Sequence, residues 1–331
     1  MTQHNTIHDF LKQNGSSFQV FDLGRRIQAV AENIFIDFES AKIPWPWPLQ
    51  QQAWLGMMLA QPNLNDMLIW FVRLPLDSRG FLDTKIHADF LQRLQQSSND
   101  DNPYGFKPKP EQMAVFHAKA AALYQTPASR FYVHARDYFS GVPGYDQWAF
   151  VGFQGIADIA ARLAQDNNAE LLAASLPNLP TQPFEALCQC LEHEAITDTL
   201  ANALLQKLEQ LLAQTETDAS VISFCLRALS GCSLATSAVT TVMTHASATH
   251  PDVLAAIAGR CWHTLQDDKR MLIYLENLAQ CAQGQEFFSA IIADLINVPG
   301  MQQPIHQSMR SPQRSLVLGK MIGGMFRQFT T

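Results

Sequence analysis

The segment FYVHARDYF carries the side chains best suited to chemistry, with a histidine, an arginine and an aspartate close together. His134, Arg136 and Asp137 could supply a general base and a clamp for an anion, with polar tips from two nearby tyrosines. On a helix, His134 shares a face with Asp137 and Tyr138, so a structural hydrogen bond is the simpler interpretation. We keep His134, Arg136 and Asp137 as candidates for ligand binding.

The segment LDSRGFLD forms a second charged group, directly after a predicted strand, where loops often carry function. Asp77 and Arg79 could bind a polar ligand at the mouth of a sheet. Ser78 and Gly80 indicate a turn, and Arg79 could instead pair with Asp77 or Asp83. Asp77 and Arg79 join the ligand-binding candidates, and no residue is assigned as catalytic.

The segment ALCQCLEHE brings together residue types that bind metals, namely Cys188, Cys190, His193 and Glu194. Positions two apart on a helix lie about 200° apart, so Cys188 and Cys190 cannot easily face one ion. The pattern favours buried cysteines beside an exposed acid. We therefore predict no metal site.

The last stretch of the chain is basic and amphipathic, because residues 295–331 hold 4 Lys or Arg against no Asp or Glu. It could dock an acidic partner or a membrane surface. It could instead form a final helix that caps an acidic helical array, and three glycines that weaken an isolated helix favour this capping. The candidates for partner docking are the four basic residues Arg310, Arg314, Lys320 and Arg327.

Common catalytic and nucleotide-binding motifs do not occur in the sequence. It has no GxSxG for serine hydrolysis, no GxxxxGK[ST] or GxGxxG for phosphate binding, and no HExxH for metalloprotease chemistry. The sequence thus favours a protein that is not an enzyme, and it indicates no cofactor.

Composition indicates an ordinary globular protein, with 47% hydrophobic and 16% charged residues. The net charge of −7 argues against broad nucleic-acid binding, and residues 176–294 hold 13 Asp or Glu against 5 Lys or Arg. No apolar run is long enough to span a membrane, and the start MTQHNTIHDFLKQ lacks the features of a signal peptide. We expect a cytoplasmic protein whose six cysteines stay reduced.

The first part of the chain, residues 1–110, combines candidate strands with short helices. FQVFDLG and RIQAV predict two strands, although the helix predicted for AENIFIDFESA could reach back over RIQAV. AWLGMMLA and MLIWFVRLPL predict a β-hairpin with its turn at QPNLND, although LQQQAWLGMMLA would also make a helix. With the helix DTKIHADFLQRLQQ over one face, the pattern predicts a small antiparallel sheet in an α+β domain.

Two segments of this part are predicted to lack regular structure. PWPWP forces an extended path, which leaves Trp45 and Trp47 as large anchors that another element must cover. SSNDDNPYGFKPKP is rich in polar and turn-forming residues, which predicts a flexible loop over residues 97–110.

Helical spacing dominates the rest of the chain. Residues 111–183 predict three helices, in EQMAVFHAKAAALYQ, in ASRFYVHARDYFS opened by Pro127, and in DQWAFVGFQGIADIAARLAQ. Residues 184–296 then repeat, since Cys188, Cys225 and Cys261 occupy matching places at spacings of 37 and 36 residues. A second helix follows each of these places, so the stretch resembles the stacked antiparallel helix pairs of a HEAT-type α-solenoid. An irregular helical bundle is the alternative.

Four segments together resemble a bacterial protein family of unknown function that is conventionally labelled only by a number. They are FQVFDLGRRI, WPLQQQAWLG, PLDSRGFL and QGIADIAARL. The resemblance covers nearly the whole chain. It implies the fold more than the activity, because it brings no site residues with it.

The sequence therefore predicts an α+β, mostly α, protein: a domain with a small antiparallel sheet (1–110), a helical connecting region (111–183) and a HEAT-like array (184–331). For function, it predicts a cytoplasmic, non-enzymatic adaptor or scaffold that binds a protein partner, with a homodimer left open. The alternative is an enzyme or small-ligand-binding protein with a polar pocket between the sheet and the following helices.

Overall fold

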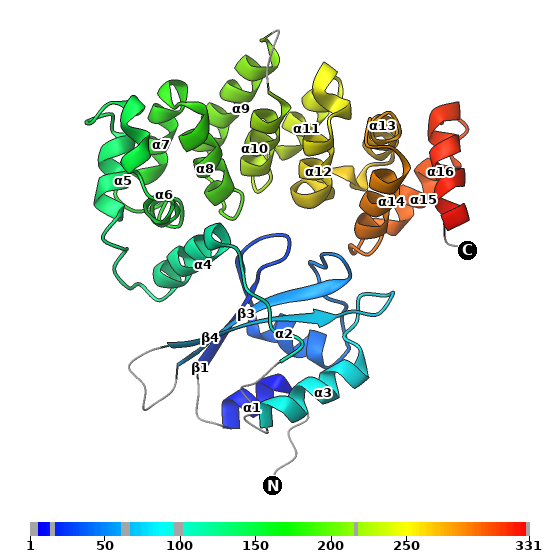
Figure 1. Cartoon of the computed structure of the whole chain (residues 1–331), viewed down its shortest axis with the longest axis horizontal. Helices are drawn as coiled ribbons and strands as arrows, with labels where there is room; N and C mark the ends of the chain where they lie inside the picture. The colour runs from blue at the N-terminus through cyan, green and yellow to red at the C-terminus, as the bar shows by residue number, and fades with distance from the viewer. Residues whose placement is uncertain (1–5, 14–16, 61–66, 96–101, 215–217, 329–331) are drawn as a thin grey trace. The chain divides into compact units, whose positions relative to one another are not determined.

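A computed structural model describes residues 6–13, 17–60, 67–95, 102–214 and 218–328. The chain divides into two compact units: Met1–Lys109 with Ile296–Gln302, and Pro110–Leu295 with Gln303–Thr331. Figure 1 shows a sheet with helices in the first unit and stacked helices in the second. The helices of residues 111–183 thus belong to the same compact unit as those of residues 184–295.

A four-stranded sheet lies in the first unit, in the order β2-β1-β3-β4, with every neighbouring pair antiparallel. Its strands are β1 (Ser17–Asp22), β2 (Gln28–Val30), β3 (Gln52–Ala60) and β4 (Met67–Pro75). The predicted small antiparallel sheet is confirmed, and the helical alternatives for RIQAV and LQQQAWLGMMLA are excluded. The predicted QPNLND turn lies outside the described residues.

Three helices pack on one face of the sheet: α1 (Ile7–Gln13), α2 (Glu32–Glu39) and α3 (Thr84–Gln95). Successive side chains of a strand point to opposite faces, so alternate residues of β3 reach this core. These are Ala53, Leu55, Met57 and Leu59, which join Ile7, Phe38 and Phe90 of the helices. Burial of each large apolar side chain contributes about 1.5–3 kcal/mol.

The two irregular segments of this unit are both held against the sheet and its helices. Trp45 is fully buried, and the centre of its ring lies 4.8 Å from that of Phe38. The backbone N–H of Trp45 donates to the carbonyl of Gly80 at 2.8 Å. Part of the predicted flexible loop lines the edge of β4, where the N–H of Arg73 donates to the carbonyl of Tyr104 at 2.8 Å. The predicted lack of regular structure is confirmed for residues 102–109, which form neither a helix nor a strand beyond a single bridge of Gly105 to Val72. The open edge of β4 holds these residues because it offers them hydrogen-bonding groups.

Two rows of helices build the second unit. In one row α4, α6, α8, α10, α12 and α14 contact each other in turn, and in the other α5, α7, α9, α11, α13 and α16 do so. Their bounds are α4 (Pro110–Leu123), α5 (Tyr132–Phe139), α6 (Phe153–Ala160), α7 (Asn168–Ser175), α8 (Thr181–Leu191), α9 (Asp198–Leu212), α10 (Ala219–Leu229), α11 (Ala235–Met243), α12 (Pro251–Arg260), α13 (Asp268–Ala279), α14 (Gly284–Leu295), α15 (Gln302–Arg310) and α16 (Leu316–Gln328). Short 3-10 helices are η1 (Tyr145–Phe150), η2 (Leu176–Asn178), η3 (Ala246–Thr249) and η4 (Trp262–Gln266).

Local sequence explains where several of these helices begin. Asp218 and Asp267 are N-caps, whose carboxylates accept N–H groups of the first turn at 2.8 and 3.0 Å. Pro251 is the first residue of α12, where its missing N–H costs nothing. These three helix starts therefore follow from residues that are local in the sequence.

Two predicted helices differ from those observed. The helix expected to open at Pro127 begins only at Tyr132. The long helix expected for DQWAFVGFQGIADIAARLAQ is divided, because Val151 and Gly152 adopt extended backbone angles between η1 and α6. No residue of η1 is buried, so burial of an apolar face does not favour a continuous helix across this point.

The repeated cysteines have a packing role. Cys188, Cys225 and Cys261 are fully buried, and all six cysteines are free thiols. Burial raises the pKa of the Cys225 thiol to about 12, which makes it an unreactive, small apolar side chain. Among the described helices, none is long and apolar enough to cross a membrane.

Candidate functional site

A buried carboxylate at the end of α8 is the centre of an ionic cluster. Glu192 is only 2% exposed. The Nε–H of Arg227, on α10, donates to one of its carboxylate oxygens, and an Nη2–H of Arg260 donates to the other at 3.0 Å. The cluster therefore joins α8, α10 and α12, three consecutive helices of one row.

Electrostatics fix the charge state of this cluster. Burial alone would raise the pKa of Glu192, but the positive charges of Arg260 and Arg227 outweigh it and lower this pKa to about 2. Burial also lowers the pKa of His193 to about 3, with its Nε2 3.3 Å from Glu192. At neutral pH the cluster therefore holds two guanidinium charges against one carboxylate.

A second ion pair continues this polar region along the same row. The Nζ of Lys119, on α4, donates to the carbonyl of His193 and to the carboxylate of Glu194, both at 2.7 Å. The predicted exposure of Glu194 is wrong, since its side chain is only 15% exposed. Lys119 makes this burial tolerable, because an unpaired buried carboxylate would cost several kcal/mol.

A groove of about 380 Å³ lies between α10 and α12 beside the cluster. Arg227 and Arg260 line it at the last turns of the two helices, while Ser220 and Asp252 line it at the first turns. The remaining lining residues are Ser223, Phe224, Ala255, Ala256 and Gly259. The groove is therefore cationic at one end and carries an acid and a hydroxyl at the other.

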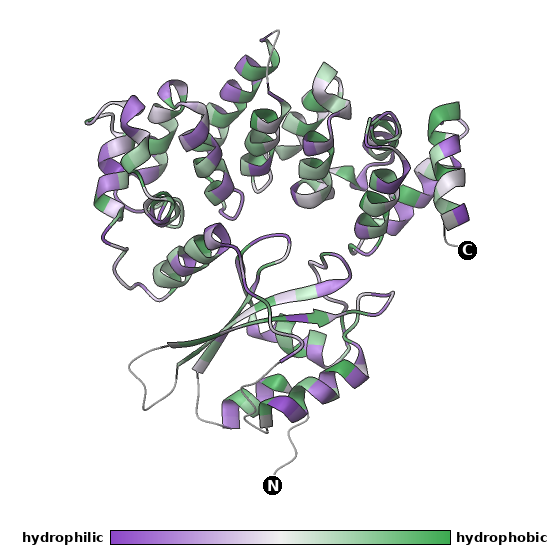
Figure 2. Ribbon diagram, viewed as in Figure 1, coloured by the Kyte–Doolittle hydropathy of each residue, from purple (hydrophilic) through white to green (hydrophobic). Residues whose placement is uncertain are grey.

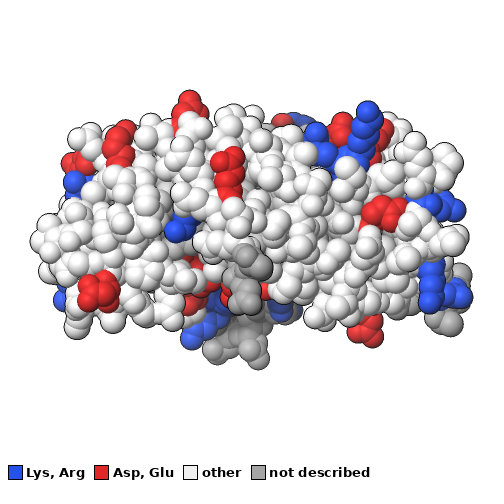
Figure 3. Space-filling view, turned by 90° about the horizontal axis from the view of Figure 1, so that it is seen from above, with Lys and Arg blue, Asp and Glu red and all other residues white. Residues whose placement is uncertain are grey.

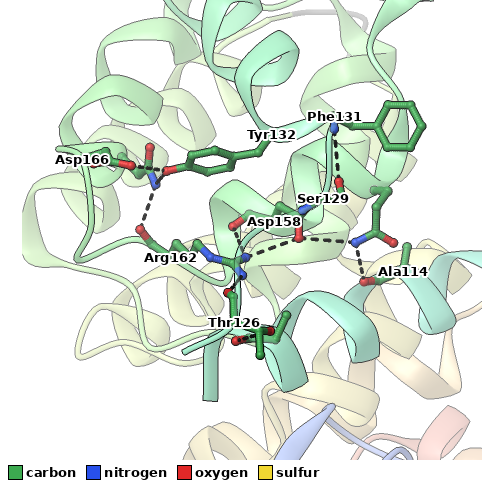
Figure 4. A network of polar contacts seen from close by, with 11 residues as sticks. Ala114, Thr126, Ser129, Phe131, Tyr132, Asp158, Arg162 and Asp166 are labelled. Carbon is green, nitrogen blue, oxygen red and sulfur yellow. Dashed lines mark hydrogen bonds and ion pairs between the residues drawn. The ribbon is translucent and has the colours of Figure 1, made fainter. Parts of the chain in front are cut away.

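A further network surrounds Asp158 and Arg162, which form a buried ion pair at 3.3 Å (Figure 4). Asp158 accepts the N–H of Ser129 at 3.1 Å, and Arg162 donates to the carbonyl of Thr126 at 3.3 Å. These bonds hold the segment between α4 and α5 against α6. Because these contacts are all made within the chain, they indicate a structural role for the network.

Arg136 belongs to the edge of this network and not to a site with its sequence neighbours. It donates to the side-chain oxygen of Asn168 and, at 2.8 Å, to the carbonyl of Asp166. His134 and Asp137 are exposed on α5, and among the described residues neither side chain forms a hydrogen bond. The structure thus separates the three predicted ligand-binding residues of this segment.

Asp77 and Arg79 contact each other, which is the local pairing that the sequence offered as the alternative to a ligand site. Asp77 accepts the N–H groups of Arg79 and Phe81 at 2.8 and 2.9 Å, and its other oxygen lies 3.2 Å from the Arg79 guanidinium. Asp83 instead accepts the N–H of Lys85 at 2.9 Å, at the start of α3. Asp77 therefore shapes a turn, and Asp83 caps the start of α3.

The four basic docking candidates lie on α15, α16 and the residues between them, and all are exposed: Arg310, Arg314, Lys320 and Arg327. Figure 3 shows Lys and Arg gathered where α16 ends the rows. α16 contacts α13 and α14, Leu318 is fully buried, and the hydroxyl of Ser315 donates to Glu276 at 2.6 Å. The helix therefore covers the end of the rows while its basic side chains face water.

A family model described as a protein of unknown function (DUF3549) matches residues 2–326. The chain belongs to this family. No curated protein and no solved structure matches the chain.

Sequence reasoning missed the ionic cluster of this DUF3549 member because its parts are distant along the chain. Glu192 lies 35 residues from Arg227 and 68 from Arg260. One signal was present, since Arg227 lies in SFCLRALSG, where apolar neighbours indicate a buried helix. A charge in such a helix requires a partner, which points to a distant acid. Within the described residues, no group of His, Cys, Asp and Glu is arranged to hold a metal.

Proposed function

We propose that the chain is a non-enzymatic scaffold that binds a protein partner on its helical rows. The observation that carries this proposal is the exposure of apolar side chains in residues 142–151, which we call the 142–151 turn. Val142 is 80% and Phe150 84% exposed, and Trp148 is 37% exposed. Val133, on the neighbouring α5, is 62% exposed.

Such exposure is costly for a chain that stays alone in water. Large apolar side chains favour burial, and monomeric proteins seldom leave several of them uncovered in one region. Trp and Phe are also enriched in the contacts that dominate protein interfaces. A partner protein that covers Trp148 and Phe150 would remove this cost.

The helical rows supply a frame for such binding. We propose that they form a HEAT-like stack, in which antiparallel pairs present one extended surface. The buried Cys188, Cys225 and Cys261 support this view, because residues at matching places of the repeat share the same environment. The 142–151 turn would lie at the first end of this stack. The enzymatic alternative stays a prediction.

We also propose a cytoplasmic location. Six free cysteines, five of them buried, suit a reducing compartment in which no disulfide forms. Fractionation of cells that express a tagged chain would test this, and recovery in an oxidising compartment would contradict it.

The test of the scaffold proposal is affinity purification of the tagged full chain from its native cells, followed by mass spectrometry. We expect at least one protein to be captured by the wild type and lost from a variant carrying Trp148→Ser and Phe150→Ser. Ile273→Ser is the matched control, because Ile273 is a 42% exposed apolar residue on α13. Identical captured proteins for all three chains, or no protein above background, would contradict the proposal.

A further inference from the structure

The two ends of the α10–α12 groove carry opposite charges. Its two lining helices belong to the same row, so their first turns lie at one end of the groove and their last turns at the other. Asp252 lies at the first end and the guanidinium groups of Arg227 and Arg260 at the second. A ligand with separated charges would therefore fit in only one orientation.

The cationic end is held rigid before any ligand arrives. Glu192 contacts both arginines from beneath the surface, and the Arg227 guanidinium lies 4.9 Å from the centre of the Phe224 ring. Fixed side chains lose little entropy on binding, which favours recognition of a planar anion such as a carboxylate.

Arg227 and Arg260 have hydrogen-bond donors that Glu192 does not use. The hydrogen bond from Arg227 to Glu192 uses only its Nε, and among the described residues neither Nη atom has a hydrogen-bond acceptor. The Nε of Arg260 is buried and also without an acceptor in the described part of the chain. The Arg227 side chain lines the groove and is 26% exposed, so its two Nη groups are the donors that an acceptor in the groove can reach.

The length and lining of the groove favour a peptide over a small acid. Asp252 and Arg260 are eight residues apart on one helix, or about 12 Å at 1.5 Å per residue. An extended chain covers about this distance with four residues. Ala255, Ala256 and Gly259 have small side chains that let a peptide backbone approach closely.

We infer that the α10–α12 groove binds a short extended peptide whose carboxylate contacts Arg227 and Arg260 and whose N–H groups face Asp252. The surface is distinct from the 142–151 turn. Loss of either binding event would therefore leave the other intact, and the two tests can fail separately.

The test uses the immobilised full chain and a pool of tetrapeptides that end in glutamate, with the other three positions mixed. The comparison pool ends in glutamine amide. We expect the wild type to retain the glutamate pool at least tenfold better than the glutamine amide pool, as quantified by mass spectrometry. Equal retention of both pools would overturn the inference.

Three variants localise the binding. Arg227→Gln removes the free donors, and Ala255→Trp places a bulky side chain in the groove while keeping Glu192, Arg227 and Arg260 in the chain. Each should lower retention at least tenfold. Lys269→Gln removes one exposed charge on α13 and should change nothing. If circular dichroism shows that Arg227→Gln misfolds, Ala255→Trp still tests the inference, and full retention by that variant would overturn it.

A competition experiment separates peptides from small acids. Displacement of the peptides by an equal concentration of free glutarate would overturn the inference, because the site would then bind small acids.

Discussion

Glu192 shows how the rows of helices accommodate a charge in their interior. Removing a carboxylate from water costs several kcal/mol, and only close, well-directed partners offset this cost. Arg227 and Arg260 provide them from two different helices. The cluster therefore couples the stability of the rows to one side chain.

We predict that Glu192→Gln lowers the free energy of unfolding by about 3–5 kcal/mol, because two partly buried guanidinium groups lose their counter-charge. Urea denaturation followed by far-ultraviolet circular dichroism measures the change. Glu209→Gln, on the exposed face of α9, is the control and should stay within about 0.5 kcal/mol of the wild type. Equal effects of the two substitutions would show that Glu192 contributes no more than a surface charge.

Asp22 leads to a prediction about pH in the first unit. Burial raises the pKa of Asp22 to about 7 from an unfolded value of 3.8, against the lowering effect of the N–H groups of Gly24 and Arg26. The folded chain therefore keeps a proton that the unfolded chain has lost, so stability falls as the pH rises from about 4 to about 7. Asp22→Asn should remove this fall. Urea titrations at pH 5 and pH 8, read by tryptophan fluorescence, should show a smaller difference for the variant; equal differences would contradict the protonated state.

At the scale of elements, local sequence patterns predicted those helices and strands whose structure depends on residues close together along the chain. The apolar segments AWLGMMLA and MLIWFVRLPL, joined by a turn-forming segment, predicted β3 and β4. Local capping by Asp218 and Asp267 and the ring of Pro251 likewise account for three helix starts. The division of the predicted helix at Val151 was missed, because tertiary contacts determine whether helical spacing becomes a buried face. The pairing of Tyr104 with β4 and the ionic cluster were missed for the same reason, since both join residues that are distant along the chain.

The crossing of α5 and α6 depends on one glycine. A Cβ at Gly155 would lie 2.6 Å from the carbonyl oxygen of Phe131 and 2.9 Å from the Cβ of Ala135. Gly155→Ala should therefore force the helices apart and destabilise the chain by about 1–3 kcal/mol. Gly323→Ala is the matched control on α16, where a Cβ meets nothing within 4 Å. It should stabilise the chain by about 0.5–1 kcal/mol through helix propensity, so thermal melts should shift in opposite directions. Shifts in the same direction would contradict the close crossing.

At the scale of the whole molecule, each of the two compact units is formed by two separate segments of the chain. Residues Ile296–Gln302 belong to the first unit, and Gln303–Thr331 return to the second. The returning segment carries the basic residues, and it also exposes Leu316 at 93% and Val317 at 49%, in the green first turn of α16 (Figure 2). A test of its buried residues can distinguish the two roles predicted for it, a cap on the rows or a docking helix.

We predict that a chain ending at Gln302 loses several kcal/mol of stability, because α15 and α16 bury Ile305 and Leu318 completely. Each such side chain contributes about 1.5–3 kcal/mol, and its loss also exposes the facing residues of α13 and α14. A thermal melt followed by circular dichroism measures the change. Arg310→Gln with Lys320→Gln removes exposed charges from the same segment and should leave the melt nearly unchanged. A truncated chain as stable as the wild type would contradict the capping role.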